Sequence, residues 1–228
     1  MSVDAKRRAR VASVLSAADI PESKLGATRW SRLSPPERAL YFWILRRFAT
    51  HGRPSGSETR SAAARLGLAA DFALGTLARE DLVHLDQTGE IAVAYPFSGR
   101  PTAHVVRFPS GHEAHTMCAI DALGIAPMFD QQITLSSSDP RGGEEIRVEL
   151  APSGDADWSP TSSVVVAGAM KSQGQSCQSC CPVLNFFASR DSAERWLEEH
   201  PQARGHAITI PEAILAGRTI FGDVLRDD

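Results

Sequence analysis

Four cysteines carry most of the chemistry that this sequence could perform. They are Cys118, Cys177, Cys180 and Cys181, so three of the four fall within five residues. Four cysteines in 228 residues do not make a disulfide framework, and a reducing compartment would keep these thiols free. Thiolate sulfur is a soft ligand, so a group of free thiols is suited to binding a soft metal.

A carboxyl group accompanies the first thiol. Cys118 and Asp121 are three residues apart in the apolar run Met117 to Leu123, which predicts the start of a helix. Residues i and i+3 share one face of a helix, so the thiol and the carboxyl group are expected side by side. A desolvated carboxyl group has a raised pKa and could accept a proton from a thiol and return it to a group bound there.

The second thiol is expected from the Cys180–Cys181 pair. A loop over residues 173–181 is predicted to lead into a strand over 183–188, with the pair where this strand begins. Successive strand residues face opposite sides, so only one of the two should meet Cys118, and Pro182 indicates a sheet edge or a bulge. Cys177-x-x-Cys180 resembles half of a zinc site, but the sequence has no matching second half.

The segment 34–98 shows the pattern of a winged helix, which is three helices followed by a two-stranded hairpin. Helices are expected over residues 34–48, 57–66 and 70–79, and the hairpin over 81–94. The third helix would face DNA in such a domain, yet it offers only Arg79 and also carries Asp71. We therefore expect a packing module and no nucleic-acid partner.

Strands dominate the middle of the chain and helices its ends, which predicts the α+β class with a mostly antiparallel sheet. Strands are expected over residues 102–108, 133–135, 146–150, 164–166 and 206–210, and helices over 191–199 and 211–225. The domains are then a tail with a short helix over 7–18 (residues 1–33), the winged-helix-like domain (34–98) and a strand-rich catalytic core with flanking helices (99–228).

Composition excludes several classes of protein. Hydrophobic residues make up 43% and charged residues 22%, which is typical of a globular chain and not of a disordered or membrane-spanning one. Residues 1–80 hold 14 Lys and Arg against 7 Asp and Glu, and the rest of the chain holds 10 against 20. We interpret the basic front part as a solvated, arginine-rich surface. No signal peptide is evident, so we expect a cytoplasmic protein with no membrane partner.

Two motifs resemble those of the organomercurial (alkylmercury) lyases. Thr116-Met117-Cys118-Ala119-Ile120-Asp121-Ala122-Leu123 is similar to their active-site segment, which reads Cys-Ala-Leu-Asp-Thr-Leu or close to it. Cys181, followed after four residues by Phe186-Phe187-Ala188-Ser189, is similar to their second motif. The order of elements agrees as well, because those lyases have a winged-helix-like part before a strand-rich core.

The resemblance implies a reaction and the residues that perform it. Two thiolates would bind the mercury of R–Hg⁺, and the aspartate would deprotonate a thiol and deliver the proton to the leaving carbon. Cys118 matches the first thiol and Asp121 the carboxylate. An ungapped match places Cys181 on the second thiol, whereas pairing Cys-Cys with Cys-Cys selects Cys180 instead. No cofactor is implied, and the product Hg²⁺ would pass from Cys118 and Cys181 to a mercuric reductase or to small thiols.

Two other functions stay open on the sequence alone. A soft-metal-binding regulator would use the winged helix for DNA, and non-catalytic members of the family would resemble it. A thiol redox protein would use Cys177, Cys180 and Cys181 and would give Asp121 no role. Cys177 is an extra cysteine relative to the family, and the hairpin segment 136–139 lacks a cysteine that members often carry.

Overall fold

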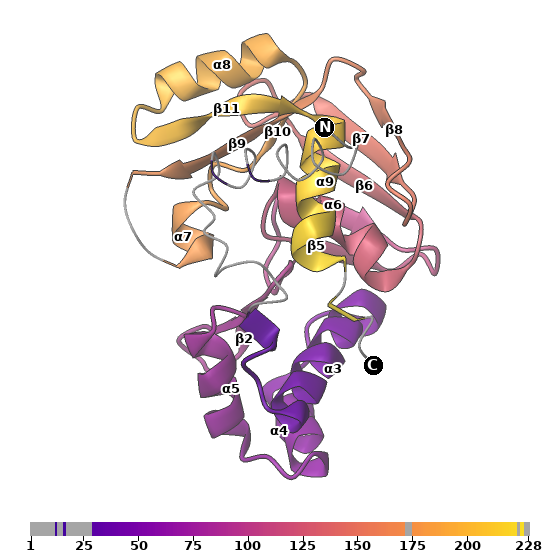
Figure 1. The fold of residues 1–228 in the computed structure, drawn as a ribbon, viewed down its shortest axis with the longest axis vertical. Helices are drawn as coiled ribbons and strands as arrows, with labels where there is room; N and C mark the ends of the chain where they lie inside the picture. The colour runs from indigo at the N-terminus through magenta and orange to yellow at the C-terminus, as the bar shows by residue number, and fades with distance from the viewer. Residues whose placement is uncertain (1–11, 13–15, 17–28, 172–174, 223, 226–228) are drawn as a thin grey trace.

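The chain folds into a helical N-terminal part joined to a larger part that contains two antiparallel sheets (Figure 1). The computed structural model describes residues 12, 16, 29–171, 175–222 and 224–225. The short helix expected over residues 7–18 lies outside the described residues, apart from Ala12 and Ser16. Helices and antiparallel strands together confirm the α+β class. In the described part of the chain, no helix is long and apolar enough to cross a bilayer.

Three helices and a hairpin form the N-terminal part. Their bounds are α3 Pro35–His51, α4 Gly56–Arg65, α5 Ala70–Arg79, β1 Val83–Leu85 and β2 Ile91–Ala94. Helix α4 begins one residue before the expected start at residue 57, because Ser55 provides the cap. Its hydroxyl accepts from the Glu58 N–H, and the Glu58 carboxylate accepts from the Ser55 N–H at 2.9 Å. This reciprocal pair satisfies two N–H groups that a helix start leaves without partners.

An eight-stranded antiparallel sheet connects this part to the rest of the molecule, in the order β1-β2-β3-β5-β4-β6-β7-β8. The additional bounds are β3 Phe97–Ser98, β4 Val105–Arg107, β5 Glu113–Thr116, β6 Ile133–Ser138, β7 Glu145–Leu150 and β8 Ala156–Ser159. Strand β3 pairs with β2 on one side and with β5 on the other. The hairpin is therefore held to the core by ladder hydrogen bonds, and β5 leads directly to the cysteine at position 118.

A three-stranded sheet, in the order β10-β9-β11, forms a second layer that helix α8 covers (Figure 1). The remaining bounds are α6 Ala119–Phe129, β9 Val164–Met170, α7 Ser176–Ser179, β10 Phe186–Phe187, α8 Arg190–Glu199, β11 Ala203–Thr209 and α9 Ile210–Phe221. Helix α8 is capped by Ser189, whose hydroxyl accepts from the Ser192 N–H, so the helix begins one residue before the expected start at residue 191.

Helices α6 and α9 pack closely through two glycines. A Cβ atom on Gly217 would lie 2.8 Å from the Gly124 nitrogen and 2.8 Å from the Ile120 carbonyl oxygen, both in the backbone of α6. Backbone atoms cannot move aside as a flexible side chain can. The absence of a side chain at Gly217 therefore sets the position of α6, the helix that begins at Cys118.

We expect Gly217→Ala to destabilise the fold by roughly 1–3 kcal/mol, since it overpacks a close helix contact. Gly142→Ala is the matched control, because a Cβ atom added there would have no neighbour within 4 Å, and a change within about 0.5 kcal/mol is expected. Urea unfolding of both variants provides the measurement. Equal stability of Gly217→Ala and the wild type would show that α6 and α9 do not depend on this contact.

Candidate active site

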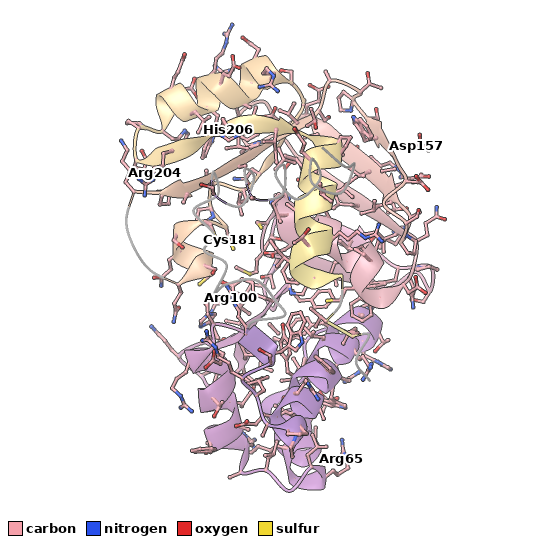
Figure 2. All side chains as sticks on the ribbon, viewed as in Figure 1. Arg65, Arg100, Asp157, Cys181, Arg204 and His206 are labelled. Atoms are coloured by element: carbon pink, nitrogen blue, oxygen red, sulfur yellow. The ribbon has the colours of Figure 1, made fainter. Side chains whose placement is uncertain are left out.

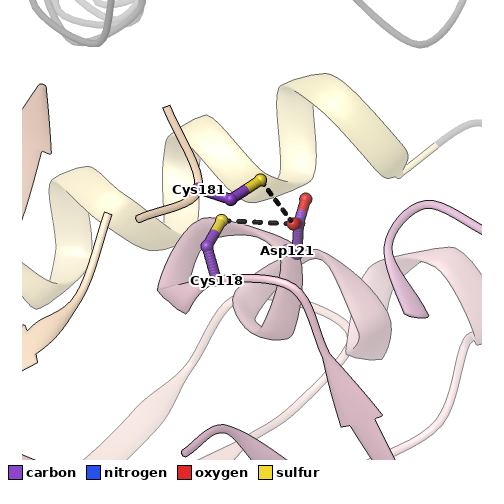
Figure 3. Close-up of side chains that lie close together, drawn as sticks. All are labelled: Cys118, Asp121 and Cys181. Atoms are coloured by element: carbon purple, nitrogen blue, oxygen red, sulfur yellow. Dashed lines mark hydrogen bonds between the residues drawn. The ribbon is translucent and has the colours of Figure 1, made fainter. Parts of the chain in front are cut away.

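The first turn of α6 presents a thiol and a carboxyl group together. Cys118 is the N-cap residue of this helix, in an extended conformation directly after β5. Its Sγ donates to Oδ2 of Asp121 at 3.2 Å (Figure 3). The Ala119 N–H donates to the Leu184 carbonyl at 2.8 Å, which connects this turn to the segment that follows Cys180 and Cys181. The i, i+3 spacing thus places the two groups side by side, as the sequence indicated.

The expected strand at Cys180–Cys181 is wrong, because both residues end a helical turn. The backbone N–H groups of Cys180 and Cys181 donate to the Ser176 carbonyl at 3.1 and 3.0 Å, which extends the turn begun by α7. The strand in this region is limited to β10, which starts at Phe186. The alternation of strand faces therefore does not decide which of the two cysteines meets Cys118.

Contacts with the carboxyl group distinguish the two cysteines. The Cys181 Sγ lies 3.9 Å from Oδ2 of Asp121, and one ligand atom from each of Cys118, Asp121 and Cys181 lies within 4.8 Å of the other two. The Cys180 Sγ instead donates to the Ser176 carbonyl at 3.4 Å. All three cluster residues are buried, and Figure 2 places Cys181 between the helical part near Arg65 and the sheet that carries His206.

A partly open pocket surrounds this cluster. Its walls combine the three cluster residues with apolar side chains and a few polar groups. The other lining residues are Arg29, Tyr95, Ile120, Ser176, Cys180, Leu184, Ile220 and Phe221. Both members of the Cys180–Cys181 pair therefore reach the pocket, and a small apolar group bound to a metal on the sulfurs would have apolar neighbours.

Burial keeps the site protonated. It raises the pKa of Asp121 to about 8 and that of the Cys118 thiol to about 12, because both groups lose their hydration. Hydrogen bonds with Cys118 and Cys180, together with burial, raise the pKa of Cys181 well above its ordinary value. Thiols bind metals as thiolates, so a metal that binds here must displace protons, and the ionised form of Asp121, which is still populated near neutral pH, is placed to receive one.

An ion-pair network that the sequence did not reveal supports the pocket. Arg29 donates to the Asp81 carbonyl at 2.9 Å, and Ser176 donates to the Asp81 carboxylate at 2.7 Å. Burial alone would raise the pKa of Asp81, but hydrogen bonds from His84 and Ser176 and the charge of Arg29 together lower it to about 2. Arg29 lies in a segment assigned to a tail and Tyr95 follows the hairpin, so neither carried a local signal.

A buried histidine holds the segment after the second thiol. His104 pairs through Nδ1 with the Ser137 hydroxyl at 2.9 Å and through Nε2 with the Asn185 side chain at 3.2 Å. Burial lowers the pKa of His104 to about 4. Between pH 6.5 and 4 the unfolded chain binds this proton and the folded chain does not, so stability decreases as the pH falls through that window.

We expect the free energy of unfolding to decrease by on the order of 3 kcal/mol between pH 7 and pH 4 on account of His104. Urea unfolding of the wild type and of His104→Gln at pH 7, 5.5 and 4 isolates this effect. The variant lacks this contribution, so the difference in free energy of unfolding between wild type and variant should shift by on the order of 3 kcal/mol against the wild type from pH 7 to pH 4. The same dependence in both proteins would rule out His104 as its source.

Comparisons with known proteins agree with these observations. A family model described as alkylmercury lyase matches residues 97–222. The alkylmercury lyase of Bacillus cereus is 26% identical over 136 residues, which are 60% of this chain and 61% of that protein. The alkylmercury lyase of Streptomyces lividans is 26% identical over 128 residues, 56% and 58% of the two chains. The chain thus matches these curated relatives over about three fifths of their length.

The fold is also that of a solved structure. Comparison of this chain with the crystal structure of the mercury-bound form of MerB2 gives a TM-score of 0.72 at 19% sequence identity. The match covers 94% of this chain and 99% of the other. The family model covers more than half of the chain and includes all three cluster residues. The chain therefore belongs to the alkylmercury lyase family.

Proposed function

We propose that the protein is an organomercurial lyase that cleaves the carbon–mercury bond of R–Hg⁺ to give R–H and Hg²⁺. The observation that carries this proposal is the buried cluster of Cys118, Asp121 and Cys181, whose ligand atoms lie within 4.8 Å of one another. Two thiols supply soft ligands for mercury, and a carboxyl group beside them can transfer a proton. The membership of the chain in the alkylmercury lyase family supports the same reaction.

The geometry suggests the order of events. Mercury forms a bond to the Cys118 sulfur, whose proton moves to Asp121 Oδ2 at 3.2 Å. The Cys181 sulfur then binds the same mercury and releases its own proton to solvent. This second sulfur–mercury bond weakens the bond from mercury to carbon. Asp121 delivers its proton to that carbon, and the hydrocarbon leaves. Hg²⁺ remains on two thiolates, and the oxidation state of mercury does not change.

The pKa of Asp121 suits this double role. A carboxyl group with a pKa of about 8 is close to balance at neutral pH, so it can accept a proton and return it without a large cost in either direction. The apolar side chains of Leu184, Ile220 and Phe221 line the pocket and provide an environment for the organic group. Burial in such a pocket also keeps water from competing for the sulfurs.

The products and partners follow from this chemistry. In our proposal the thiols and the carboxyl group suffice without a cofactor, and Hg²⁺ stays on Cys118 and Cys181 until small thiols or a mercuric reductase take it. A cytoplasmic location would keep the thiols reduced. The substrate is an organomercury cation, and we propose no nucleic-acid or membrane partner.

We also propose that α3, α4, α5, β1 and β2 form a winged-helix-like domain over residues 34–98, followed by the catalytic domain over 99–228. Three helices followed by a hairpin support this division. Arg79, the only basic residue of α5, donates to the Thr76 hydroxyl of the same helix at 2.9 Å. This charge pattern favours a packing role over DNA binding.

A direct test of the activity uses purified, reduced protein, phenylmercuric acetate and an excess of small thiol. Benzene in the headspace is the expected product. Tight binding of mercury without any benzene would contradict the lyase proposal and favour a soft-metal-binding protein of the same fold.

A further inference from the structure

Three of the four cysteines lie on a single helical turn. Cys177 is three residues before Cys180 and four before Cys181, and the hydrogen bonds of Cys180 and Cys181 to the Ser176 carbonyl keep this stretch helical. Residues at i, i+3 and i+4 share one helix face, with Cβ atoms about 5–6 Å apart. The proposed mechanism uses only Cys181 of the three.

Together with Cys118, these residues form a row of sulfurs that runs from the interior toward the surface. The Cys181 thiol hydrogen-bonds with those of Cys118 and Cys180, and Cys177 lies one helical turn before Cys180. The exposed fraction is 1% for Cys118, 6% for Cys181 and 7% for Cys180, whereas Cys177 is only half-buried. Cys177 is therefore the sulfur of the row most accessible from outside.

We infer that Cys180 and Cys177 form an exit site for mercuric ion, which takes Hg²⁺ from the Cys118–Cys181 pair and presents it to an external thiol. This inference rests on the proposed lyase function, because cleavage leaves Hg²⁺ on the two buried sulfurs. An external thiol would otherwise have to enter the pocket to reach the mercury. Thiolate ligands on one helix face would instead carry the ion from the buried pair to the half-buried Cys177, where an external thiol can reach it.

Each transfer is a ligand exchange without oxidation or reduction. The Cys180 sulfur forms a bond to mercury and loses its proton, while the bond from mercury to the Cys118 sulfur breaks and that sulfur takes up a proton. The ion is then held by Cys181 and Cys180. A second exchange replaces Cys181 by Cys177, which gives up its proton to the departing sulfur. Two external thiols then replace Cys180 and Cys177 in turn, and each passes its proton to the sulfur that it displaces, so that all the cysteines return to the thiol form.

A buried tyrosine provides an independent observation at the same place. The Tyr95 side chain is 3% exposed, and its hydroxyl lies beside the Cys177 thiol, close enough to hydrogen-bond with it. The Cys181 and Cys177 sulfurs are close enough to act on it electrostatically. A thiolate of this row, free or bound to mercury, would accept a stronger hydrogen bond from this hydroxyl than a neutral thiol does. The Tyr95 hydroxyl can thus donate a hydrogen bond that stabilises a thiolate in this row of sulfurs.

The test measures release of mercury and does not depend on cleavage. Wild type, Cys177→Ser and Cys177→Ala are loaded with one equivalent of HgCl₂ and mixed with excess glutathione, and protein-bound mercury is measured against time. We expect both variants to release Hg²⁺ about tenfold more slowly than the wild type. Ser179→Ala is the matched control, because this residue is half-buried like Cys177, lies in the same turn and contributes no sulfur, and it should release mercury at the wild-type rate.

Wild-type release rates in both Cys177 variants would overturn the exit site. Slow release in Ser179→Ala as well would also overturn it, because the effect would then come from a loosened turn. Benzene release from phenylmercuric acetate is recorded on the same wild-type sample. Absence of benzene contradicts the lyase function, whereas the HgCl₂ measurement still decides whether Cys177 carries mercury outward.

Discussion

Asp121→Asn is expected to lower the rate of carbon–mercury cleavage by at least about 100-fold while Hg²⁺ still binds. Asparagine has nearly the same shape but can neither accept a proton from Cys118 nor deliver one to carbon, and general acid–base catalysis contributes about 10²–10⁴-fold. The measurement is benzene formed in a single turnover of phenylmercuric acetate, alongside Hg²⁺ affinity in competition with a small thiol. Wild-type cleavage by this variant would remove Asp121 from the mechanism.

Stability provides a control for this variant. The pKa of Asp121 is about 8 in the folded protein and near 4 in the unfolded chain, so the folded state binds more protons between these values. The contribution of Asp121 to the free energy of unfolding therefore decreases as the pH rises from about 4 to 8. Asp121→Asn has no carboxyl group here and should not show this decrease. We expect the variant to be more stable than the wild type at pH 8 in urea unfolding. A less stable variant would mean that the loss of activity reflects damage to the fold.

Cys181→Ser is expected to lose the single-turnover burst of benzene almost entirely, to below about a hundredth of the wild type. A hydroxyl is a poor ligand for mercury, and Cys181 is the second sulfur within 4.8 Å of both Cys118 and Asp121. Cys118→Ser should behave in the same way. Headspace benzene from one equivalent of phenylmercuric acetate measures the burst for each variant.

Cys180→Ser is the matched comparison, since it removes a sulfur that lines the same pocket but bonds to the Ser176 carbonyl. Its burst should stay within a few-fold of the wild type. The opposite pattern, with the burst lost in Cys180→Ser and kept in Cys181→Ser, would move the second catalytic thiol to Cys180 and contradict the assignment made from the geometry.

Local patterns predicted most of the described helices and half of the site. The Cys118–Asp121 pair follows from helical periodicity alone, because one turn of α6 is enough to bring the two groups together. The starts expected at residues 34 and 211 lie within one residue of the observed starts of α3 and α9, because Ser34 caps the first of these helices and the proline at position 211 suits a first turn. In such segments the nearest neighbours in the sequence are also the contacts that decide the structure.

The second thiol and the polar surroundings depend on contacts between distant segments. The stretch before Pro182 is polar and small, so it gave no periodicity, and the turn at Cys180–Cys181 is held by hydrogen bonds to Ser176. Ser176 is itself bound to Asp81, 95 residues away in the chain. Arg29 reaches the pocket through the same network. No local signal could have predicted these contacts.

The most direct test of the central claim is a single turnover of phenylmercuric acetate in D₂O. The reduced wild-type protein should release one equivalent of benzene that carries one deuterium, because the proton delivered to carbon comes from thiol and carboxyl groups that exchange with solvent. One equivalent of inorganic mercury should remain on the protein. Mercury retained as phenylmercury, with no deuterated benzene in the headspace, would contradict protonolysis by the Cys118, Asp121 and Cys181 cluster.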